Sequence, residues 1–385
     1  RVGIKQYMKK IKILFLVNVD WFFLSHRLPI ALEAAAQGFE VHVATTTTDQ
    51  AKVIEGLGFI LHEVKISRGD LGIFTTFKTF LDIIKIFNNV RPKIVHLVTI
   101  KPIILGGIAA RIANIHGVVA AISGLGYVFI NQGFLSSVRR FFIKALYKIA
   151  LGHSNLKVIC QNSADYNEIK NISKLSSDSF VLINGSGVSL EEFQYFPDTN
   201  KIPKIIMASR MLEDKGVLEF SAAAQQLKTL GILADFILVG DPDPDNPSSI
   251  KKSQIQDWEQ EGILKHWGHR DEMQEVLRMA SIVVLPSYRE GFPKVLIEAA
   301  ACGRPVITTD VPGCRDAIYH GKTGMLVPPK NSNALADAIK NLVLQPEECR
   351  KMGLAGRAMA EERFDEKIVI EEHFSIYNQL LLNIK

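Results

Sequence analysis

Short apolar runs alternate with longer amphipathic segments along the first half of the chain. The apolar runs predict buried strands at 12–17, 41–44, 93–98, 118–122 and 157–161. Apolar residues at helical spacing predict helices at 28–37, 75–88, 102–113 and 136–151. Within 75–88, one predicted apolar face is made by Phe77, Phe80, Leu81, Ile84 and Phe87. This order favours a parallel sheet covered by helices, closed by the strand at 157–161.

The second half repeats the pattern. Strands are predicted at 204–208, 234–239, 282–285 and 305–309, and helices at 271–280, 294–301, 333–343 and 367–382. Pro197, Asn200 and Pro203 mark a linker between the halves. We therefore expect an α/β protein with two βαβ domains, residues 8–195 and 196–365, and a final helix at 366–385.

Composition agrees with two globular domains. The 385 residues exceed one ordinary core, and 47% are hydrophobic and 22% charged. The four cysteines have no CxxC spacing, so neither zinc nor a disulfide framework is indicated, and a reduced, cytoplasmic setting fits best. Residues before Met8 lack the apolar core of a secretory signal, and we expect 1–7 to be an extension. The uncharged run 117–138 contains too many polar residues and glycines for a spanning helix.

Charge is unevenly distributed around a net of +5. Residues 1–185 hold 22 Lys and Arg against 11 Asp and Glu, whereas the remainder holds 23 against 29. This asymmetry indicates an anionic surface or ligand for the first half. Nucleic acid is not favoured, because no nucleic-acid-binding motif accompanies the charge.

The segment 136–151 is both amphipathic and basic. Its basic residues are Arg139, Arg140, Lys144 and Lys148. One interpretation is a helix that lies on an anionic membrane. The alternative is an ordinary surface helix with an apolar face toward the core.

The loop after the first strand reads NVDWFFLSHR and has no G-x-G-x-x-G pattern, which argues against a dinucleotide-dependent dehydrogenase. His26 and Arg27 lie near the expected carboxyl edge of that strand, where an arginine suits phosphate geometry. The alternative is a histidine at a helix N-terminus and a solvated arginine. Ser123 and Gly124 follow another strand, where glycine allows close approach of a ligand or simply forms a tight turn.

The most informative stretch runs from 285 to 315 and predicts strand, loop, helix and strand, with Pro293 as the first helical residue. Such a unit places a ligand at the carboxyl ends of parallel strands. Glu290 lies in the loop and Glu298 on the helix. Main-chain N–H groups at the helix start and the nearby Lys294 favour an anion such as phosphate. Ordinary solvation of both carboxylates is the alternative.

Residues 290–307, EGFPKVLIEAAACGRPVI, resemble the donor-binding signature of retaining family-4 glycosyltransferases with the GT-B fold. The branch that this stretch resembles makes bacterial surface polysaccharides such as O-antigen and capsule, and includes N-acetylgalactosaminyltransferases that act on polyprenyl-diphosphate-linked sugars. The resemblance implies two Rossmann-like domains facing across a cleft, donor in the second and acceptor in the first. It also implies that the last helix crosses back to the first domain.

The resemblance implies roles for particular residues. Arg210 and Lys215 would hold the donor diphosphate, Glu290 the sugar, and Glu298 the ribose. The remaining implied donor contacts are Phe292, Lys294, Val295, Leu296, Gly268 and Arg270. Several relatives carry a sugar-contacting histidine at about the position of Ser123, so no catalytic histidine is carried over to this chain. His26, Arg27, Ser123 and Gly124 remain candidates on the acceptor side.

Asp241-x-Asp243 invites a metal interpretation, since carboxylates hold Mg²⁺ against phosphates. The resembling family generally needs no metal, so we expect a rigid metal-free loop and no cofactor.

The predicted function is retaining transfer of a hexose or N-acetylhexosamine from a UDP-sugar to a polyprenyl-diphosphate-linked saccharide. We expect a peripheral protein on the cytoplasmic face of the inner membrane. The alternatives are a GT-B nucleotide-sugar epimerase and a non-catalytic nucleotide- or polyanion-binding module.

Overall fold

The computed structural model describes residues 10–66, 72–125, 134–244 and 246–383, with the backbone alone for 134–141. The expected extension at 1–7 and the side chains of Arg139 and Arg140 therefore lie outside the described part. The chain divides into two compact units. The first comprises the residues up to Cys160, Asp165–Ile183 and Ile370–Lys385, and the second comprises Gln161–Ala164 and Asn184–Val369.

The first unit is built on a seven-stranded parallel sheet of order β3-β2-β1-β4-β5-β6-β7. Its strands are β1 (Lys12–Val19), β2 (Glu40–Thr46), β3 (Ile60–Glu63), β4 (Ile94–Val98), β5 (Gly117–Ile122), β6 (Leu156–Cys160) and β7 (Phe180–Leu182). The prediction that 157–161 closes this sheet is wrong, because β7 pairs in parallel with β6. At three residues, β7 is too short for its apolar pattern to be recognised as a strand.

The helices of the first unit fill the connections between these strands. They are α1 (Asp20–His26), α2 (Leu28–Ala36), α3 (Ala51–Gly56), α4 (Ile73–Val90), α5 (Ile100–Ile112), α6 (Phe134–Ala150) and α7 (Ser163–Ser173). The segment after β1, expected to be a loop, contains the short helix α1. Its residue Phe23 is buried against Phe15 of β1, with ring centroids 5.7 Å apart, so tertiary packing favours the helix there.

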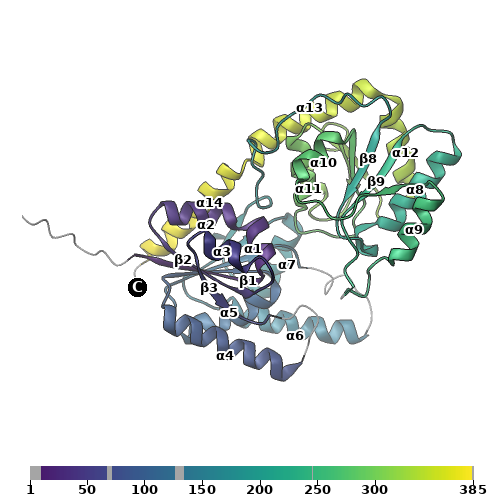
Figure 1. Ribbon diagram of the computed structural model, residues 1–385. Coiled ribbons are helices and arrows are strands. Elements are labelled where there is room, and N and C mark those ends of the chain that lie inside the picture. Colours follow the sequence, from purple (N-terminus) through teal and green to yellow (C-terminus); the bar gives the residue numbers. More distant parts are fainter. Residues whose placement is uncertain (1–9, 67–71, 126–133, 245, 384–385) are drawn as a thin grey trace, which may run out of the picture. The chain divides into compact units, whose positions relative to one another are not determined.

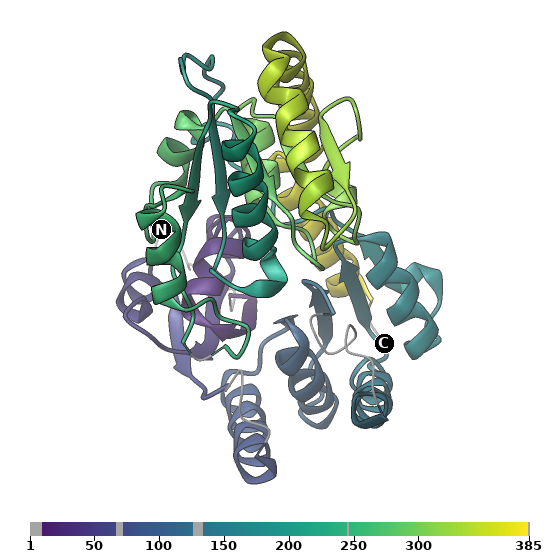
Figure 2. The same ribbon diagram turned by 90° about the vertical axis from the view of Figure 1, so that its right-hand side faces the viewer.

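Alternate residues of the central strands serve two helix layers, as the two-residue period of a strand requires. Leu14 and Leu16 of β1 and Val95 and Leu97 of β4 join the core that includes residues of α4 and α5. Phe15 and His96 stack with ring centroids 5.1 Å apart, and His96 stacks in turn on His373. His373 belongs to α14 (Glu366–Leu382), and Figures 1 and 2 show α4, α5 and α6 together on one side of this sheet.

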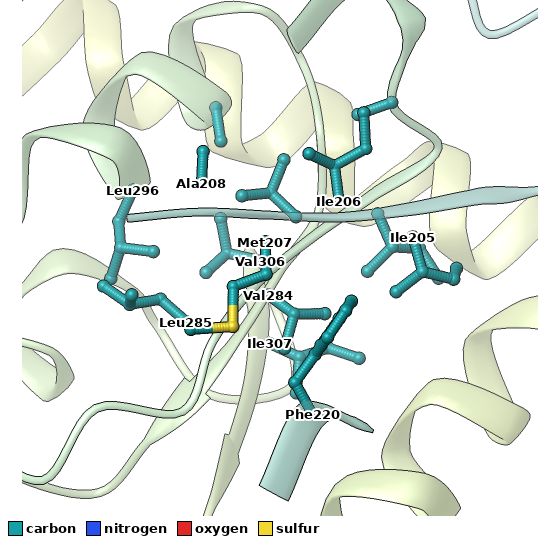
Figure 3. Close-up of a cluster of buried hydrophobic side chains, with 14 of the residues drawn as sticks. Ile205, Ile206, Met207, Ala208, Phe220, Val284, Leu285, Leu296, Val306 and Ile307 are labelled. Atoms are coloured by element: carbon teal, nitrogen blue, oxygen red, sulfur yellow. The ribbon is translucent and has the colours of Figure 1, made fainter. Parts of the chain in front are cut away.

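The second unit contains a six-stranded parallel sheet of order β10-β9-β8-β11-β12-β13. Its strands are β8 (Lys204–Ala208), β9 (Asp235–Val239), β10 (Lys265–His266), β11 (Ile282–Leu285), β12 (Val306–Thr309) and β13 (Gly324–Val327). The surrounding helices are α8 (Val217–Thr229), α9 (Lys252–Gln260), α10 (Met273–Met279), α11 (Lys294–Ala301), α12 (Ser332–Leu344) and α13 (Pro346–Arg363). Figure 3 shows the buried residues of β8, β11 and β12 packed with Phe220 and Leu296.

Candidate active site

Three loops lie together at the carboxyl ends of the central strands β8, β11 and β12 of the second unit. Gly216 has a φ of +80°, and a Cβ built there would lie 2.2 Å from the carbonyl oxygen of Pro286. Gly313, with φ +81°, would place a Cβ 2.5 Å from the carbonyl oxygen of Gly291. Because both positions exclude a side chain, the loops after β8 and β12 pack directly on the loop that carries Glu290.

Glu290 is held by two donors that converge on one of its oxygens. Lys215 Nζ lies 2.5 Å from Oε1 of Glu290, and Ser287 Oγ donates to the same Oε1 at 2.7 Å. Ser287 is fully buried, and the carboxylate of Glu290 is only 12% exposed. Two hydrogen bonds to one oxygen fix the carboxylate plane and leave Oε2 with its acceptor capacity for a ligand.

Arg210 lies on the loop after β8 and forms an ion pair with Asp243 from the loop after β9. Arg210 Nη1 is 2.8 Å from Asp243 Oδ2, and the two side chains are 46% and 27% exposed. An exposed pair of this kind is worth little in stability, so it leaves the guanidinium available to a stronger anion. Over the described residues, no group of three or more His, Cys, Asp and Glu is placed to hold a metal ion.

Glu298 is a buried carboxylate on α11, at 5% exposure, with Lys294 Nζ 3.3 Å from its Oε1. Burial raises the pKa of Glu298 above the ordinary carboxyl value of 4.5, and the ion pair with Lys294 offsets this only in part. A buried carboxylate at this position can accept hydrogen bonds from two neighbouring sugar hydroxyls. Lys294, predicted to favour an anion, is therefore also a partner of Glu298.

The raised pKa of Glu298 predicts how stability depends on pH. The unfolded chain releases this proton near the ordinary carboxyl pKa, whereas the folded protein retains it to higher pH. The folded state therefore binds more protons in that window, and its free energy of unfolding falls as pH rises through the raised pKa. Glu298→Gln should remove this decline, which denaturant titrations of both proteins across that pH range would show. An identical pH dependence in the two proteins would contradict the raised pKa of the Glu298 carboxyl.

The start of α11 differs in detail from the prediction. Pro293 immediately precedes the helix, which begins at Lys294. The N–H of Leu296 donates to the carbonyl of Pro293 at 3.1 Å, so this one of the expected anion donors is used within the first turn. Phe292 is buried and packs edge-on against Phe364, which anchors the turn, while Val295 is half-buried.

Gly268 and Arg270, expected near the nucleobase, follow β10 at the same edge of the sheet. The carbonyl of Gly268 accepts the N–H of Gly240 at 2.8 Å, which ties this segment to the loop after β9. Arg270 is exposed. The structure thus brings Lys215 and Glu290 into contact. It places Gly268 and Arg270 after β10, which β9 separates from β8.

In the first unit, Arg27 lies close to Ser123. Arg27 Nη2 is 3.4 Å from Ser123 Oγ, and Nη1 donates to the carbonyl of His26 at 2.8 Å. The alternative of a solvated arginine is wrong, because Arg27 is only 2% exposed and its Nε has no hydrogen-bond partner. Burial lowers the pKa of Arg27 to about 10, and no carboxylate of the described chain forms an ion pair with it.

His26 is the last residue of α1, so it lies at the C-terminal end of that helix rather than at a helix N-terminus, and it stacks on Phe22 with ring centroids 4.0 Å apart. Gly124 follows Ser123 with a φ of +106°, a conformation that glycine adopts without strain. A buried guanidinium beside a serine and a glycine at strand ends is an arrangement suited to an anion.

Sequence reasoning missed two residues of the site. The sequence predicts no role for Ser287, and it places Asp243 with Asp241 in a rigid metal-free loop, with a metal site as the alternative. Asp243 is 33 residues from Arg210 along the chain, and nothing in the sequence indicates their ion pair. The signal available for Ser287 was its position three residues before a carboxylate in a loop, the spacing of local side-chain hydrogen bonds.

The hydroxyl of Ser287, which also lies 3.1 Å from the carbonyl oxygen of Asp214, can be removed by a small substitution. For the transferase activity that the sequence resemblance implies, Ser287→Ala should lower turnover about three- to tenfold, as expected for one lost hydrogen bond, while the apparent KM for the donor changes less. Ser287→Thr, which retains the hydroxyl, should restore part of the rate. Steady-state kinetics of both variants test this. Equal losses in the two would indicate a packing effect and contradict the positioning role.

The chain has two units, each built on a parallel sheet, and this is the architecture of the GT-B class of proteins. Two family models match, "Glycosyl transferases group 1" over residues 190–359 and "Glycosyl transferase 4-like" over residues 12–163. The chain is 30% identical to the N,N'-diacetylbacillosaminyl-diphospho-undecaprenol alpha-1,3-N-acetylgalactosaminyltransferase of Campylobacter jejuni, over 94% of this chain and 99% of that protein. It is 27% identical to the capsular polysaccharide biosynthesis glycosyltransferase CapM of Staphylococcus aureus, over 97% and 98%.

Solved structures agree on the fold. Sucrose-phosphate synthase from Thermosynechococcus elongatus superposes with a TM-score of 0.80 at 21% identity, over 97% of this chain and 99% of that one. Anabaena HepE in complex with UDP gives a TM-score of 0.75 at 19% identity, over 95% and 98%. The chain belongs to the group 1, or family 4, glycosyltransferases, which are retaining enzymes of GT-B fold.

Proposed function

We propose that this enzyme transfers a hexose or N-acetylhexosamine from a UDP-sugar to a polyprenyl-diphosphate-linked saccharide in surface-polysaccharide or glycan biosynthesis. The convergence of Lys215 and Ser287 on one oxygen of Glu290 is the observation that carries the proposal. The Campylobacter relative acts, by its name, on an undecaprenol-diphosphate-linked acceptor, and HepE was solved with UDP. Both support the donor and acceptor classes.

The donor diphosphate would be held by Arg210 and Lys215. Two cations at the strand-to-helix loop after β8 stabilise the negative charge that grows on the departing diphosphate. Binding would draw Arg210 from Asp243, since a phosphate offers the guanidinium a bidentate partner of higher charge. Glu298 would accept hydrogen bonds from the ribose hydroxyls, and these bonds would offset the cost of burying its carboxylate.

Glu290 would use Oε2 to accept a sugar hydroxyl or to stabilise positive charge at the anomeric carbon. Main-chain N–H groups near the start of α11 would complete the anion site. The proposed reaction uses no protein nucleophile: the leaving phosphate itself takes the proton of the acceptor hydroxyl on the face where the new bond forms. This assignment retains the anomeric configuration.

The acceptor diphosphate is assigned to Arg27 with Ser123, and His26 and Gly124 are placed beside them. The buried guanidinium of Arg27 has an Nε–H without a hydrogen-bond partner, and a bound phosphate would accept this hydrogen bond and neutralise the buried positive charge. Arg27→Met should therefore raise the apparent KM for the lipid-linked acceptor at least tenfold, a size typical of a lost charged hydrogen bond. Arg111→Met removes a more exposed arginine of the same unit and should leave that KM unchanged. Unchanged acceptor kinetics in Arg27→Met would contradict the assignment.

The lipid-linked acceptor implies a peripheral protein at the cytoplasmic face of the inner membrane. Over the described residues, no helix is long and apolar enough to cross a membrane. The basic helix α6 was the sequence candidate for membrane contact. Lys148 is exposed, whereas Lys144 forms an ion pair with Glu168 at 2.8 Å. Part of the positive charge of α6 is therefore already compensated.

A release assay tests the reaction directly. Purified protein is incubated with a panel of UDP- and GDP-sugars, with and without a polyprenyl-diphosphate-linked saccharide. The expected result is nucleotide release from one UDP-sugar, only when the lipid-linked acceptor is present. Conversion of a donor without acceptor would identify an epimerase, and no reaction across the panel would support the binding module. Either outcome would overturn the proposal.

A further inference from the structure

The first half of α4 exposes large apolar side chains to solvent. Ile73 is 83% exposed, Phe74 91%, Phe77 59% and Leu81 49%. Ile73, Phe77 and Leu81 are spaced four residues apart and Phe74 adjoins them, so they form one stripe along the helix. Phe77 and Leu81 were predicted to share the apolar face of Phe87, and this was wrong. The other three residues of the predicted face, Phe80, Ile84 and Phe87, do pack on the core. Thr79, Ile83 and Val90 of α4 are also buried.

The helix α6 presents a second apolar stripe. Phe142 is 61% exposed, Leu146 40% and Ile149 49%, at spacings of four and three residues. Tyr147 and Ala150, which follow Leu146 and Ile149 in the sequence and point about 100° further round the helix, belong to the buried core. Each of these two helices therefore has an apolar face toward the core and another toward solvent.

Both helices pack against α5 and lie in one helix layer on the same side of the first sheet (Figures 1 and 2). We call the seven exposed apolar side chains of these helices the α4–α6 apolar surface. They are Ile73, Phe74, Phe77, Leu81, Phe142, Leu146 and Ile149. The two stripes lie on helices that flank α5. Single exposed apolar residues need no explanation, but several along one helix, as on α4 and again on α6, mark an interaction surface.

Charge around this surface indicates what covers it. Lys78 and Lys85 of α4 and Lys148 of α6 are exposed beside the apolar stripes. Two copies of the surface placed face to face would bring these like charges together, whereas anionic lipid headgroups would compensate them. Phe74 is also almost fully exposed, and a fluid lipid interface accommodates a protruding ring without a matching cavity.

We propose that the α4–α6 apolar surface is a lipid-docking face that inserts α4 side chains, Phe74 and Phe77 foremost, among anionic headgroups. The inference deepens the proposed function and rests on it for the lipid-linked acceptor. It differs from the sequence interpretation, which relied on the positive charge of α6. Here apolar insertion by α4 supplies most of the affinity, and the lysines supply the preference for anionic lipid.

Vesicle co-sedimentation separates these contributions. The wild type should bind vesicles of phosphatidylcholine mixed with phosphatidylglycerol, and bind pure phosphatidylcholine less. Phe74→Ser/Phe77→Ser should weaken binding to both vesicle types by roughly tenfold for each ring removed from the interface. A second variant, Phe142→Ser/Ile149→Ser, should weaken it through α6. Leu230→Ser/Leu233→Ser is the matched control, because these leucines are 62% and 69% exposed on the second unit.

Transfer to two acceptors distinguishes failure of this inference from failure of the proposed function. With a water-soluble acceptor carrying a short prenyl chain, Phe74→Ser/Phe77→Ser should react at the wild-type rate. With the long-chain acceptor in vesicles, its rate should fall with its binding. Unchanged vesicle binding of this variant would overturn the docking face, as would a wild-type dimer that this variant converts to a monomer in sedimentation. Absence of transfer by the wild type to either acceptor would overturn the proposed function alone, since the vesicle result stands without it.

Discussion

Glu290→Gln should lower the turnover number about 100- to 1,000-fold, the usual loss when one stabilising group is removed from a reacting centre. The amide keeps the shape of the side chain but loses the negative charge that would stabilise a developing cation on the sugar. It also offers Lys215 a weaker partner than the carboxylate at 2.5 Å. Donor binding should change far less, because the proposed role of Glu290 is realised in the transition state.

The measurement is steady-state transfer, with nucleotide affinity and a thermal melt as independent checks of the fold. Glu191→Gln is a matched control, since Glu191 also forms an ion pair with a lysine, Lys367 at 3.0 Å, but is exposed. The control should react at the wild-type rate. A Glu290→Gln enzyme that also reacted at that rate would remove Glu290 from the mechanism.

Lys215→Met should cost a similar factor, about 100- to 1,000-fold in turnover, for two reasons. The ammonium is one of two cations assigned to the departing diphosphate, and it also holds Oε1 of Glu290. Methionine keeps most of the aliphatic volume, so the loop between β8 and α8 should fold as before. Lys228→Met is the control, because Lys228 binds carbonyl groups at the far end of α8.

The double variant Lys215→Met/Glu290→Gln tests whether the two residues act together. If Lys215 works partly through Glu290, the double variant should lose much less than the product of the two single losses. Fully multiplicative losses would mean that the two residues act independently. That result would contradict a shared arrangement, although each residue could still contact the donor.

The regular elements were largely predictable because their patterns are local. The strand at 204–208 and the helix at 294–301 coincide with β8 and α11, where an apolar run and a glycine after the last turn define the bounds. The misses depend on tertiary contacts. The short strand β7 is recognisable only beside β6, and α1 forms where Phe23 packs on Phe15. On α4, Phe80, Ile84 and Phe87 pack on the core as predicted, whereas Phe77 and Leu81 do not. A helix with apolar residues on more than one side does not define the limits of its core face.

The site was predictable to the extent that it follows one continuous motif. Glu290 and Glu298 are recognisable because both belong to one continuous stretch, residues 290–307, that resembles a known donor-binding signature. The hydrogen bond of Ser287 and the ion pair of Asp243 depend on how loops from different strands meet. The burial of Arg27 depends likewise on the packing around it, and an arginine is exposed in most settings.

The division of α14 between the two units has a consequence for biosynthesis. Its residues from Ile370 onward belong to the first unit, where Tyr377 hydrogen-bonds His96 Nδ1 at 2.6 Å and His373 stacks on the same ring. The ribosome makes these residues only after the whole of the second unit. During translation the β1 and β4 face bearing Phe15 and His96 therefore lacks this cover, and the second unit can complete its core first. A truncation or fusion that disturbs α14 should therefore leave this face of the first unit uncovered and cause the protein to aggregate, although the second unit is intact.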